Sequence, residues 1–352
     1  MARRAVILGG TGQIGRAIGE RLLRHGWAVD LVARHADGMP AALRAMGGRF
    51  VEADRRQEDA LRRALAGGAD LVVDCVCFGA DDAAALLNVC RDVTTFVVMS
   101  SASVYADAHG RSLDTSTGPD DFPVLPVPVA EAQSTIAPGT EGYSPRKVAM
   151  ERMLLDAGLN VTVVRPAAIH GAGSAFPREW HFVKRALDRR PAVILATEGR
   201  ARFQTTTADN LASLVEAVAE LPGARVLNCG DPASPSALEI SRAIAEAMGH
   251  VRIEVLLPGP PISVGVGKSP WQAPHPVVLD MSAAAKLGYE PVTTYARAVP
   301  ATCRWLVEVT RDRDWREVLP QAAGYLAPML DYDAEDAYLA SLVSDTQARS
   351  LS

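Results

Sequence analysis

The stretch AVILGGTGQIGRAIGERLLRHGWAVDLVAR, residues 5–34, indicates the fold class of this chain. A short apolar run stops at a cluster of glycines, and apolar residues then recur at helical spacing until Gly26. A second apolar run, residues 27–34, has the pattern of a strand. A strand, a glycine-rich turn, a helix and a second strand in this order are typical of a nucleotide-binding parallel sheet. We therefore predict an α/β fold of the Rossmann type, with a doubly wound parallel sheet.

The glycine-rich turn is predicted to bind a dinucleotide. Glycines allow a tight turn there and let backbone N–H groups at the start of the following helix approach a pyrophosphate. A plain glycine-rich turn is the alternative, but the strand and helix around it favour cofactor binding. The residues predicted to form this cofactor loop are Gly9, Gly12, Gln13, Ile14 and Gly15.

The end of the second strand indicates which dinucleotide binds. A carboxylate there would accept hydrogen bonds from the ribose of NAD, whereas an arginine accommodates the 2′-phosphate of NADP. Ala33 stands where the acid is expected, Arg34 follows it, and Asp30 lies too early in the strand to reach the ribose. This pattern favours NADP over NAD, with a solvated loop role for Arg34 as the alternative.

Three further apolar runs alternate with helical patterns, which predicts βαβ units and a parallel sheet. Asp54 closes the third strand, where its carboxylate would either reach the adenine amine or cap the next helix. The fourth run is predicted as a buried strand from Leu71 to Val76. The fifth ends in Ser100, Ser101 and Ser103, at the strand end where such sheets bind ligands.

The composition excludes several classes of protein. The 352 residues are 48% hydrophobic and 22% charged, as in a globular protein of about two domains. A formal net charge of −5 argues against a nucleic-acid partner. Five cysteines without metal-ligand spacing argue against a disulfide framework and a metal site. Since no signal-peptide core or membrane-length apolar run is present, we expect a cytoplasmic protein without a membrane partner.

The stretch EGYSPRKVAMERML, residues 141–154, places a tyrosine and a lysine on one helical face. Tyr143 and Lys147 are four residues apart, so their side chains are neighbours. A nearby ammonium and an oxidised nicotinamide would stabilise the tyrosine phenolate, and lowering its pKa from about 10 by about three units corresponds to roughly 4 kcal/mol. The spacing alone is common on helices, and only the surrounding motifs make it a predicted catalytic pair.

In combination, the motifs resemble those of extended short-chain dehydrogenases/reductases of the NAD-dependent epimerase/dehydratase type. GGTGQIG, SSASVYA, YSPRK, VTVVRPAAIHGAG and LNCGD occur in the order seen in that family, within roughly residues 4–307. The resemblance implies that Tyr143 exchanges a proton with substrate, that Lys147 binds the nicotinamide ribose and eases tyrosine deprotonation, and that Ser101 hydrogen-bonds the substrate oxygen. It also matches Gly9, Gly12 and Gly15 to the cofactor loop and Asp54 to an adenine-side acid.

Three positions depart from the family pattern. Arg146 stands where Ser or Thr usually precedes the lysine. Pro145 is tolerable in a first helical turn, because its missing N–H would have no helical partner there. Ala168 stands where members acting on nucleotide sugars often carry Asn, which argues against a nucleotide-sugar substrate.

We expect residues 1–170 to form an NAD(P)-binding Rossmann domain that also uses 201–230. Residues 171–352 would form mainly a smaller C-terminal substrate-binding lobe and the C-terminal helices. A homodimer is expected from the resemblance. The face that would supply its contact carries Met150, Met153 and Leu154, although core packing explains these residues equally well.

The predicted function is an NAD(P)-dependent oxidoreductase acting on a small molecule. It would transfer a hydride between nicotinamide and a secondary alcohol or ketone, with Tyr143 as acid/base. One alternative is a sugar-nucleotide epimerase that keeps NAD tightly bound. A second is a non-catalytic RNA-binding relative of the family, against which the acidic net charge and the Ser–Tyr–Lys set argue.

Overall fold

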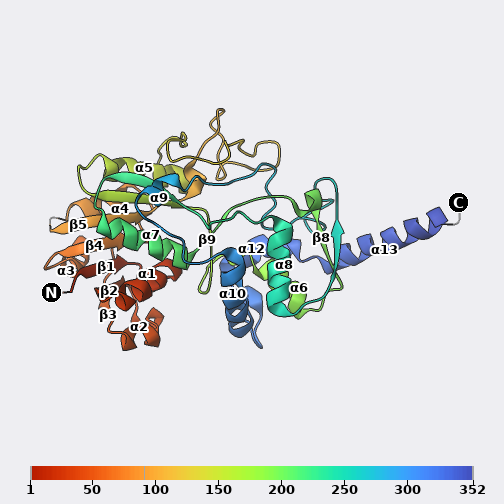
Figure 1. The fold of residues 1–352 in the computed structure, drawn as a ribbon, viewed down its shortest axis with the longest axis horizontal. Helices are drawn as coiled ribbons and strands as arrows, with labels where there is room; N and C mark the ends of the chain where they lie inside the picture. The colour runs from red at the N-terminus through yellow and green to blue at the C-terminus, as the bar shows by residue number, and fades with distance from the viewer. Residues whose placement is uncertain (1, 91, 351–352) are drawn as a thin grey trace. The chain divides into compact units, whose positions relative to one another are not determined.

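The structure, a computed structural model, describes residues 2–90 and 92–350. It divides into two compact units, each assembled from three segments of the chain (Figure 1). Unit 1 comprises Met1–Ile169, Gln204–Ala233 and Val277–Thr294. Unit 2 comprises His170–Phe203, Ser234–Pro276 and Tyr295–Ser352.

Unit 1 contains a seven-stranded parallel sheet with the order β10-β6-β5-β4-β1-β2-β3. The chain adds β2 and β3 on one side of β1 and then continues with β4 on the other side, so the switch point lies between β1 and β4. The predicted doubly wound parallel sheet is therefore confirmed. The strands are β1 (Arg4–Leu8), β2 (Ala28–Ala33), β3 (Arg49–Glu52), β4 (Ala69–Asp74), β5 (Val93–Met99), β6 (Val161–Pro166) and β10 (Arg225–Cys229).

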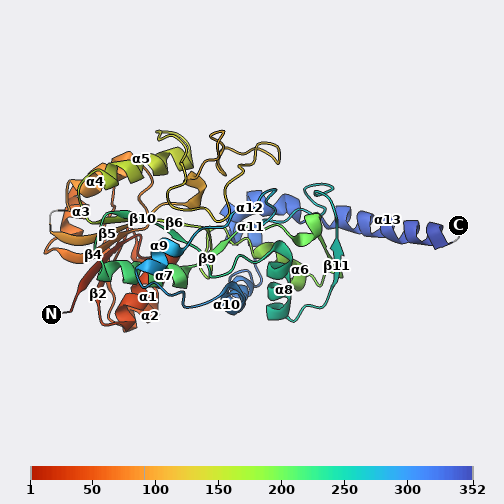
Figure 2. The same cartoon turned by 45° about the horizontal axis from the view of Figure 1, so that its top comes forward.

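Both faces of this sheet are buried, because successive side chains of a strand point to opposite faces. In β1, Ala5 and Ile7 belong to one apolar core, and Val6 and Leu8 belong to another. Helices cover both faces, in the layers that Figure 2 shows. One layer has α1 (Gln13–Arg24) and α7 (Ala208–Glu220), and the other has α3 (Glu58–Ala64), α4 (Ala80–Leu87) and α5 (Tyr143–Leu155). Shorter helices of unit 1 are α2 (Ala41–Ala45), α9 (Ser282–Lys286) and the 3-10 turns η1 (Ala36–Gly38) and η2 (Ala102–Val104).

Strand β4 ends earlier than its apolar run predicts. The sequence predicts a strand to Val76, but β4 ends at Asp74. The reason is that an Asp74 carboxylate oxygen accepts a hydrogen bond of 2.9 Å from the backbone N–H of Val76, which turns the chain. The apolar residues beyond Asp74 therefore form part of a loop at the carboxyl end of the sheet.

Unit 2 is built mainly from helices around its own core. This core includes Phe182 and Trp271, whose rings are stacked with centroids 5.7 Å apart. Helix α8 begins with a capping box formed by Ser236 and Glu239. The helices are α6 (Trp180–Leu187), α8 (Ala237–Met248), α10 (Tyr295–Val309), α11 (Trp315–Val318), α12 (Pro320–Leu326) and α13 (Tyr332–Ser350), with 3-10 turns η3 (Ala196–Gly199) and η4 (Ala327–Met329).

The remaining strands form two small sheets. Strands β8 (Ala192–Leu195) and β11 (Ile253–Leu256) pair in parallel. Strands β7 (Ala168–His170) and β9 (Thr205–Thr207) pair with each other where the chain leaves and re-enters unit 1. Across the described residues, no helix combines the length and the apolar character needed to cross a membrane.

Candidate active site

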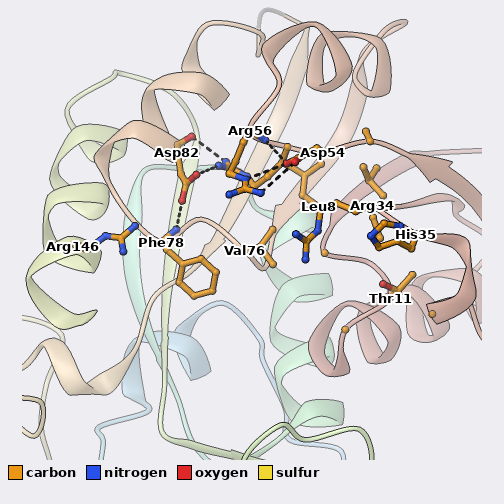
Figure 3. A pocket seen from close by; sticks show the side chains of 17 residues that line it. Leu8, Thr11, Arg34, His35, Asp54, Arg56, Val76, Phe78, Asp82 and Arg146 are labelled. Atoms are coloured by element: carbon orange, nitrogen blue, oxygen red, sulfur yellow. Dashed lines mark hydrogen bonds and ion pairs between the residues drawn. The ribbon is translucent and has the colours of Figure 1, made fainter. Parts of the chain in front are cut away.

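A cavity of about 670 Å³ lies at the carboxyl ends of strands β1, β2, β3 and β4. This edge includes the switch point of the sheet, where open α/β folds bind ligands. Figure 3 shows Arg34 and His35 at one end of the cavity and Phe78 and Arg146 at the other. The lining residues are Leu8, Gly9, Thr11, Gly12, Val32, Ala33, Arg34, His35, Gly38, Ala53, Asp54, Arg55, Arg56, Val76, Phe78, Asp82 and Arg146.

The glycine turn packs so closely that side chains would not fit at Gly9 or Gly15. Gly9 follows β1 with φ +80°, and a Cβ there would lie 2.8 Å from a methyl carbon of Val76. A Cβ on Gly15, in the first turn of α1, would lie 2.4 Å from the carbonyl oxygen of Gly9. The two glycines therefore let α1 begin directly against the turn that lines the cavity.

The start of α1 is suited to an anion. Its N-cap is Gly12, which has no side chain to accept hydrogen bonds from the first N–H groups. Gln13 and Ile14 begin the helix. The structure describes every residue of its first turn, and none of them is acidic. The helix dipole and the N–H groups at this end favour a bound negative charge. Together with the volume of the cavity, these features fit the pyrophosphate of a dinucleotide.

Two predicted cofactor residues, Arg34 and Asp54, line the cavity just beyond the ends of β2 and β3. Arg34 directly follows β2 and is exposed at the cavity, with no ion pair to any of the described residues. Asp54 follows β3 and accepts a hydrogen bond of 3.0 Å from the backbone N–H of Arg56. Hydrogen bonds from Arg56 hold the pKa of Asp54 below its usual value, and the charge of Arg34 acts in the same direction. Asp54 does not cap α3, whose N-cap is Gln57.

The serine cluster after β5 connects this strand to helix α5. Ser101 is the N-cap of η2, and its hydroxyl oxygen accepts hydrogen bonds from the Ser103 N–H at 3.1 Å and the Ser103 hydroxyl at 2.9 Å. The Ser103 hydroxyl lies 2.8 Å from that of Ser144, in the first turn of α5. The cluster therefore brings the end of β5 next to the residue that follows Tyr143.

Tyr143 is the first residue of α5, with 44% of its surface exposed. Burial around its hydroxyl raises the pKa of Tyr143, a hydrogen bond from the Ser101 hydroxyl acts against this rise, and the carboxylate of Asp114 adds to it. Asp114 also accepts a hydrogen bond of 2.9 Å from the Ser144 N–H. The sequence argument expects a stabilised phenolate once the cofactor is bound, whereas this arrangement keeps the tyrosine protonated near neutral pH.

Lys147 is buried one helical turn after Tyr143. Its ammonium donates hydrogen bonds of 2.7 Å to the backbone carbonyls of Cys77 and Met99. The ammonium nitrogen lies 5.7 Å from the ring centroid of Tyr143 and 4.5 Å from that of Phe78. Burial lowers the pKa of Lys147 to about 8. The lysine is therefore predominantly charged at neutral pH and is held in place by the carbonyl at the end of β5 and by a carbonyl of the loop that follows β4.

The described residues that line the cavity do not include Ser101, Tyr143 or Lys147. Phe78 lies between the cavity and the Ser101–Tyr143–Lys147 group, since it lines the cavity and its ring contacts the Lys147 ammonium. Arg146 also lines the cavity, although the sequence marks it only as a departure from the family pattern.

Sequence reasoning missed several lining residues, namely Thr11, His35, Arg55, Arg56 and Phe78. Their positions in the sequence could have identified them, because each lies within a few residues of the end of a predicted strand. Among residues 2–90 and 92–350, no three His, Cys, Asp or Glu side chains are grouped to hold a metal ion.

The sequence is similar to a known enzyme family and to a characterised reductase. The model of the NAD dependent epimerase/dehydratase family matches residues 5–230. The 2′-dehydrokanamycin reductase of Streptomyces kanamyceticus is 30% identical over 226 residues, which are 61% of this chain and 58% of that protein. The match thus spans less than two thirds of the length of this curated relative.

Solved structures of similar fold include three with TM-scores above 0.6. An epimerase of Methanothermobacter thermautotrophicus has a TM-score of 0.64 and 17% identity, with 90% of this chain and 94% of that chain covered. The UDP-glucose 4-epimerase of Thermotoga maritima has a TM-score of 0.63 and 17% identity, with 87% of this chain and 99% of that chain covered. The enzyme WbmH of Bordetella bronchiseptica was solved in complex with NAD⁺. It has a TM-score of 0.63 and 20% identity, with 88% of this chain and 99% of that chain covered. At these identities the likeness concerns the fold alone.

Proposed function

Because this chain belongs to the NAD-dependent epimerase/dehydratase family, we propose that it is an NAD(P)-dependent reductase or dehydrogenase of a secondary alcohol or its ketone. Family membership and the related reductase make it an enzyme of the reductase, dehydrogenase or epimerase type. The observation that carries the finer proposal is the arrangement at the start of α5. There the hydroxyl of Tyr143 meets that of Ser101, and the Lys147 ammonium lies 5.7 Å from the tyrosine ring.

Each residue of this group has a distinct task in the proposed reaction. When bound, the nicotinamide supplies or accepts the hydride. Ser101 would donate a hydrogen bond to the substrate oxygen and polarise its carbonyl. Tyr143, kept protonated by its raised pKa, would deliver its hydroxyl proton to the same oxygen during ketone reduction. Lys147 has three N–H donors, of which two are held by carbonyls, so the third would bind a ribose hydroxyl.

We further propose NADP as the preferred cofactor. Arg34 and His35 line the cavity directly after β2, and the strand end carries Ala33 in place of an acidic residue. An arginine at this position suits the additional 2′-phosphate of NADP. Family membership by itself supports an NAD-type dinucleotide, so the preference rests on these side chains.

The reductase direction is favoured over epimerisation by the related protein, which is named for the reduction of 2′-dehydrokanamycin. Ala168, where nucleotide-sugar enzymes of the family often carry Asn, supports the same choice. The proposed substrate is therefore a small molecule with a ketone or secondary alcohol.

The test is a binding and turnover experiment with the purified full chain. Nicotinamide fluorescence is titrated for NADPH and NADH, and oxidation of each is then followed with a panel of ketones that includes 2′-dehydrokanamycin. We expect tighter binding of NADPH and its consumption with at least one ketone. Tightly bound NAD in the purified protein, together with no consumption of added NADPH with any ketone, would contradict the reductase proposal and favour an epimerase.

A further inference from the structure

We propose that Arg146 is a phosphate ligand of the bound dinucleotide and contacts its pyrophosphate from the side of the cavity opposite Arg34. This inference rests on the proposed binding of NAD(P), and it concerns a residue that the family pattern does not assign to the cofactor. It is carried by the position of the Arg146 side chain, the order of the strands beneath the cavity, and the ion pairs of the neighbouring arginines.

The side chain of Arg146 is held at the cavity wall. It lies against Gly79, the N-cap of α4, where an added Cβ would be 3.3 Å from the Arg146 Nε. Figure 3 shows its guanidinium beside Phe78, which also lines the cavity. Arg146 also lines a second cavity of about 530 Å³, which extends along α4 and past residues 138–140. Arg146 thus lies between the proposed cofactor cavity and the second cavity.

The order of the strands indicates which phosphate Arg146 faces. Strand β1 lies between β2 and β4, and the glycine turn that follows β1 is the predicted pyrophosphate site. Arg34 follows β2, on the side where the adenosine ribose and its 2′-phosphate would lie. Gly79, which supports Arg146, follows β4 on the other side of β1. Arg146 therefore approaches the pyrophosphate and not the 2′-phosphate.

The neighbouring arginines are already paired with carboxylates. Arg55 donates a hydrogen bond of 2.6 Å to Asp74 and also pairs with Asp82. Arg56 pairs with Asp54 at 3.4 Å. Within residues 2–90 and 92–350, no carboxylate pairs with the side chain of Arg146. Guanidinium groups bind phosphate oxygens through planar, charge-assisted hydrogen bonds, so this cation is available to an anionic ligand.

The inference separates the roles of the two unpaired arginines. A contact with the pyrophosphate, which NADPH and NADH share, would contribute equally to the binding of both. A contact with the 2′-phosphate would contribute to NADPH alone. Arg34 and Arg146 are therefore expected to have different effects on cofactor preference, although both carry one positive charge at the same cavity.

The experiment measures dissociation constants of NADPH, NADH and ADP-ribose by titration calorimetry for the wild-type protein and three variants. The variants are Arg146→Met, Arg34→Met and the control Arg152→Met, which removes an exposed charge from the same helix outside the cavity. We expect Arg146→Met to weaken all three ligands by roughly tenfold, as for a hydrogen bond to a charged group at an exposed site. Arg34→Met should weaken NADPH alone, and Arg152→Met should have no effect.

Each remaining outcome has a defined meaning. If Arg146→Met binds all ligands as Arg152→Met does, or loses affinity for NADPH alone, the inference is wrong while the proposed function stands. If the wild-type protein binds neither NADPH nor NADH, both are wrong. Thermal unfolding without ligand checks that the variants are folded, and Arg146→Lys, which keeps the charge, should recover part of the lost affinity.

Discussion

Lys147 has only 2% of its surface exposed, although it carries the charge on which the predicted catalytic pair depends. Desolvation disfavours a buried ammonium, and this lowers the pKa of Lys147 to about 8. The carbonyls of Cys77 and Met99, together with the charges of Asp74 and Glu151, favour the charged form and limit the fall. These groups are distant from Lys147 in the sequence, with the exception of Glu151.

The lowered pKa of Lys147 predicts how the stability of the protein depends on pH. The folded-state pKa is about 8 and the reference value is 10.5, so between these pH values the unfolded chain binds more protons. Stability relative to Lys147→Met should therefore rise with pH across this window, by about 3 kcal/mol. Urea unfolding at several pH values measures the difference. The exposed-site control Lys286→Met should show no such slope, and a flat or falling difference for Lys147→Met would contradict the prediction.

Tyr143→Phe should separate chemistry from cofactor binding. The substitution removes the hydroxyl proton but keeps the ring, so we expect turnover to fall by roughly 10²–10⁴-fold, the usual contribution of a general acid. The dissociation constant of NADPH should change by less than about twofold, because the proposed role of the hydroxyl is in proton transfer and not in cofactor binding. A twofold change corresponds to less free energy than one typical hydrogen bond contributes. Tyr325→Phe, at an exposed tyrosine of unit 2, is the matched control and should leave turnover unchanged. Full turnover in Tyr143→Phe would exclude this tyrosine as the acid.

Among the elements of unit 1, helix α5 carries both core-packing residues and the predicted catalytic pair. Met150 and Leu154 are fully buried in the core that α5 shares with α4 and the sheet. Met153 is 37% exposed. The core-packing alternative therefore holds for Met150 and Leu154, which cannot supply the dimer contact expected for them. The homodimer itself stays a prediction, and of these three residues only Met153 could contribute to it.

The two methionines of α5 provide a matched test of this assignment. Met150→Ala should lower the free energy of unfolding by about 2–5 kcal/mol, because it leaves a cavity in a packed core. Met153→Ala, at an exposed position, should change it by less than about 0.5 kcal/mol. Denaturant unfolding of both variants measures the difference. Equal effects of the two substitutions would show that the assignment of helix faces is incorrect.

At the scale of the whole molecule, each unit is completed by segments that are distant in the sequence. In unit 1, β10 joins the sheet beside β6, and residues 277–294 return to the same unit. In unit 2, Arg185 of α6 forms a buried ion pair with Glu335 of α13, 150 residues later. Arg185 also donates a hydrogen bond of 2.8 Å to the carbonyl of Met329. The C-terminal helix is thus fastened to unit 2 by a charged contact inside its core.

Breaking this ion pair should destabilise unit 2. Glu335→Ala would leave the charge of Arg185 buried without its carboxylate, which costs about 3–5 kcal/mol of unfolding free energy. Asp336→Ala is the control, since Asp336 follows Glu335 on α13 and pairs with Arg190 but has an exposed side chain. It should leave the unfolding midpoint nearly unchanged. The measurement is chemical unfolding followed by tryptophan fluorescence, because Trp180, Trp271 and Trp315 lie in the core of unit 2. A Glu335→Ala midpoint equal to that of Asp336→Ala would refute the prediction.

Local patterns in the sequence were sufficient for the fold class and the motifs. The continuous apolar run at 5–8 predicts a strand with two buried faces, and the glycines at 9, 12 and 15 predict a tight turn before a helix. The spacing of Tyr143 and Lys147 likewise predicts one helical face. These features follow from backbone geometry over one or two turns, which residues close in sequence control.

Tertiary structure alone decided where β4 ends, which residues of α5 are buried, and how the predicted site is charged. The ammonium of Lys147 is held by carbonyls 70 and 48 residues away, and these could not be read from its neighbours in the chain. Arg146 lines the cavity at the carboxyl ends of β1–β4 because α5 packs beside the start of α4. The physical reason is that protonation, desolvation and ion pairing depend on every group within a few ångströms. Only the folded chain brings those groups together.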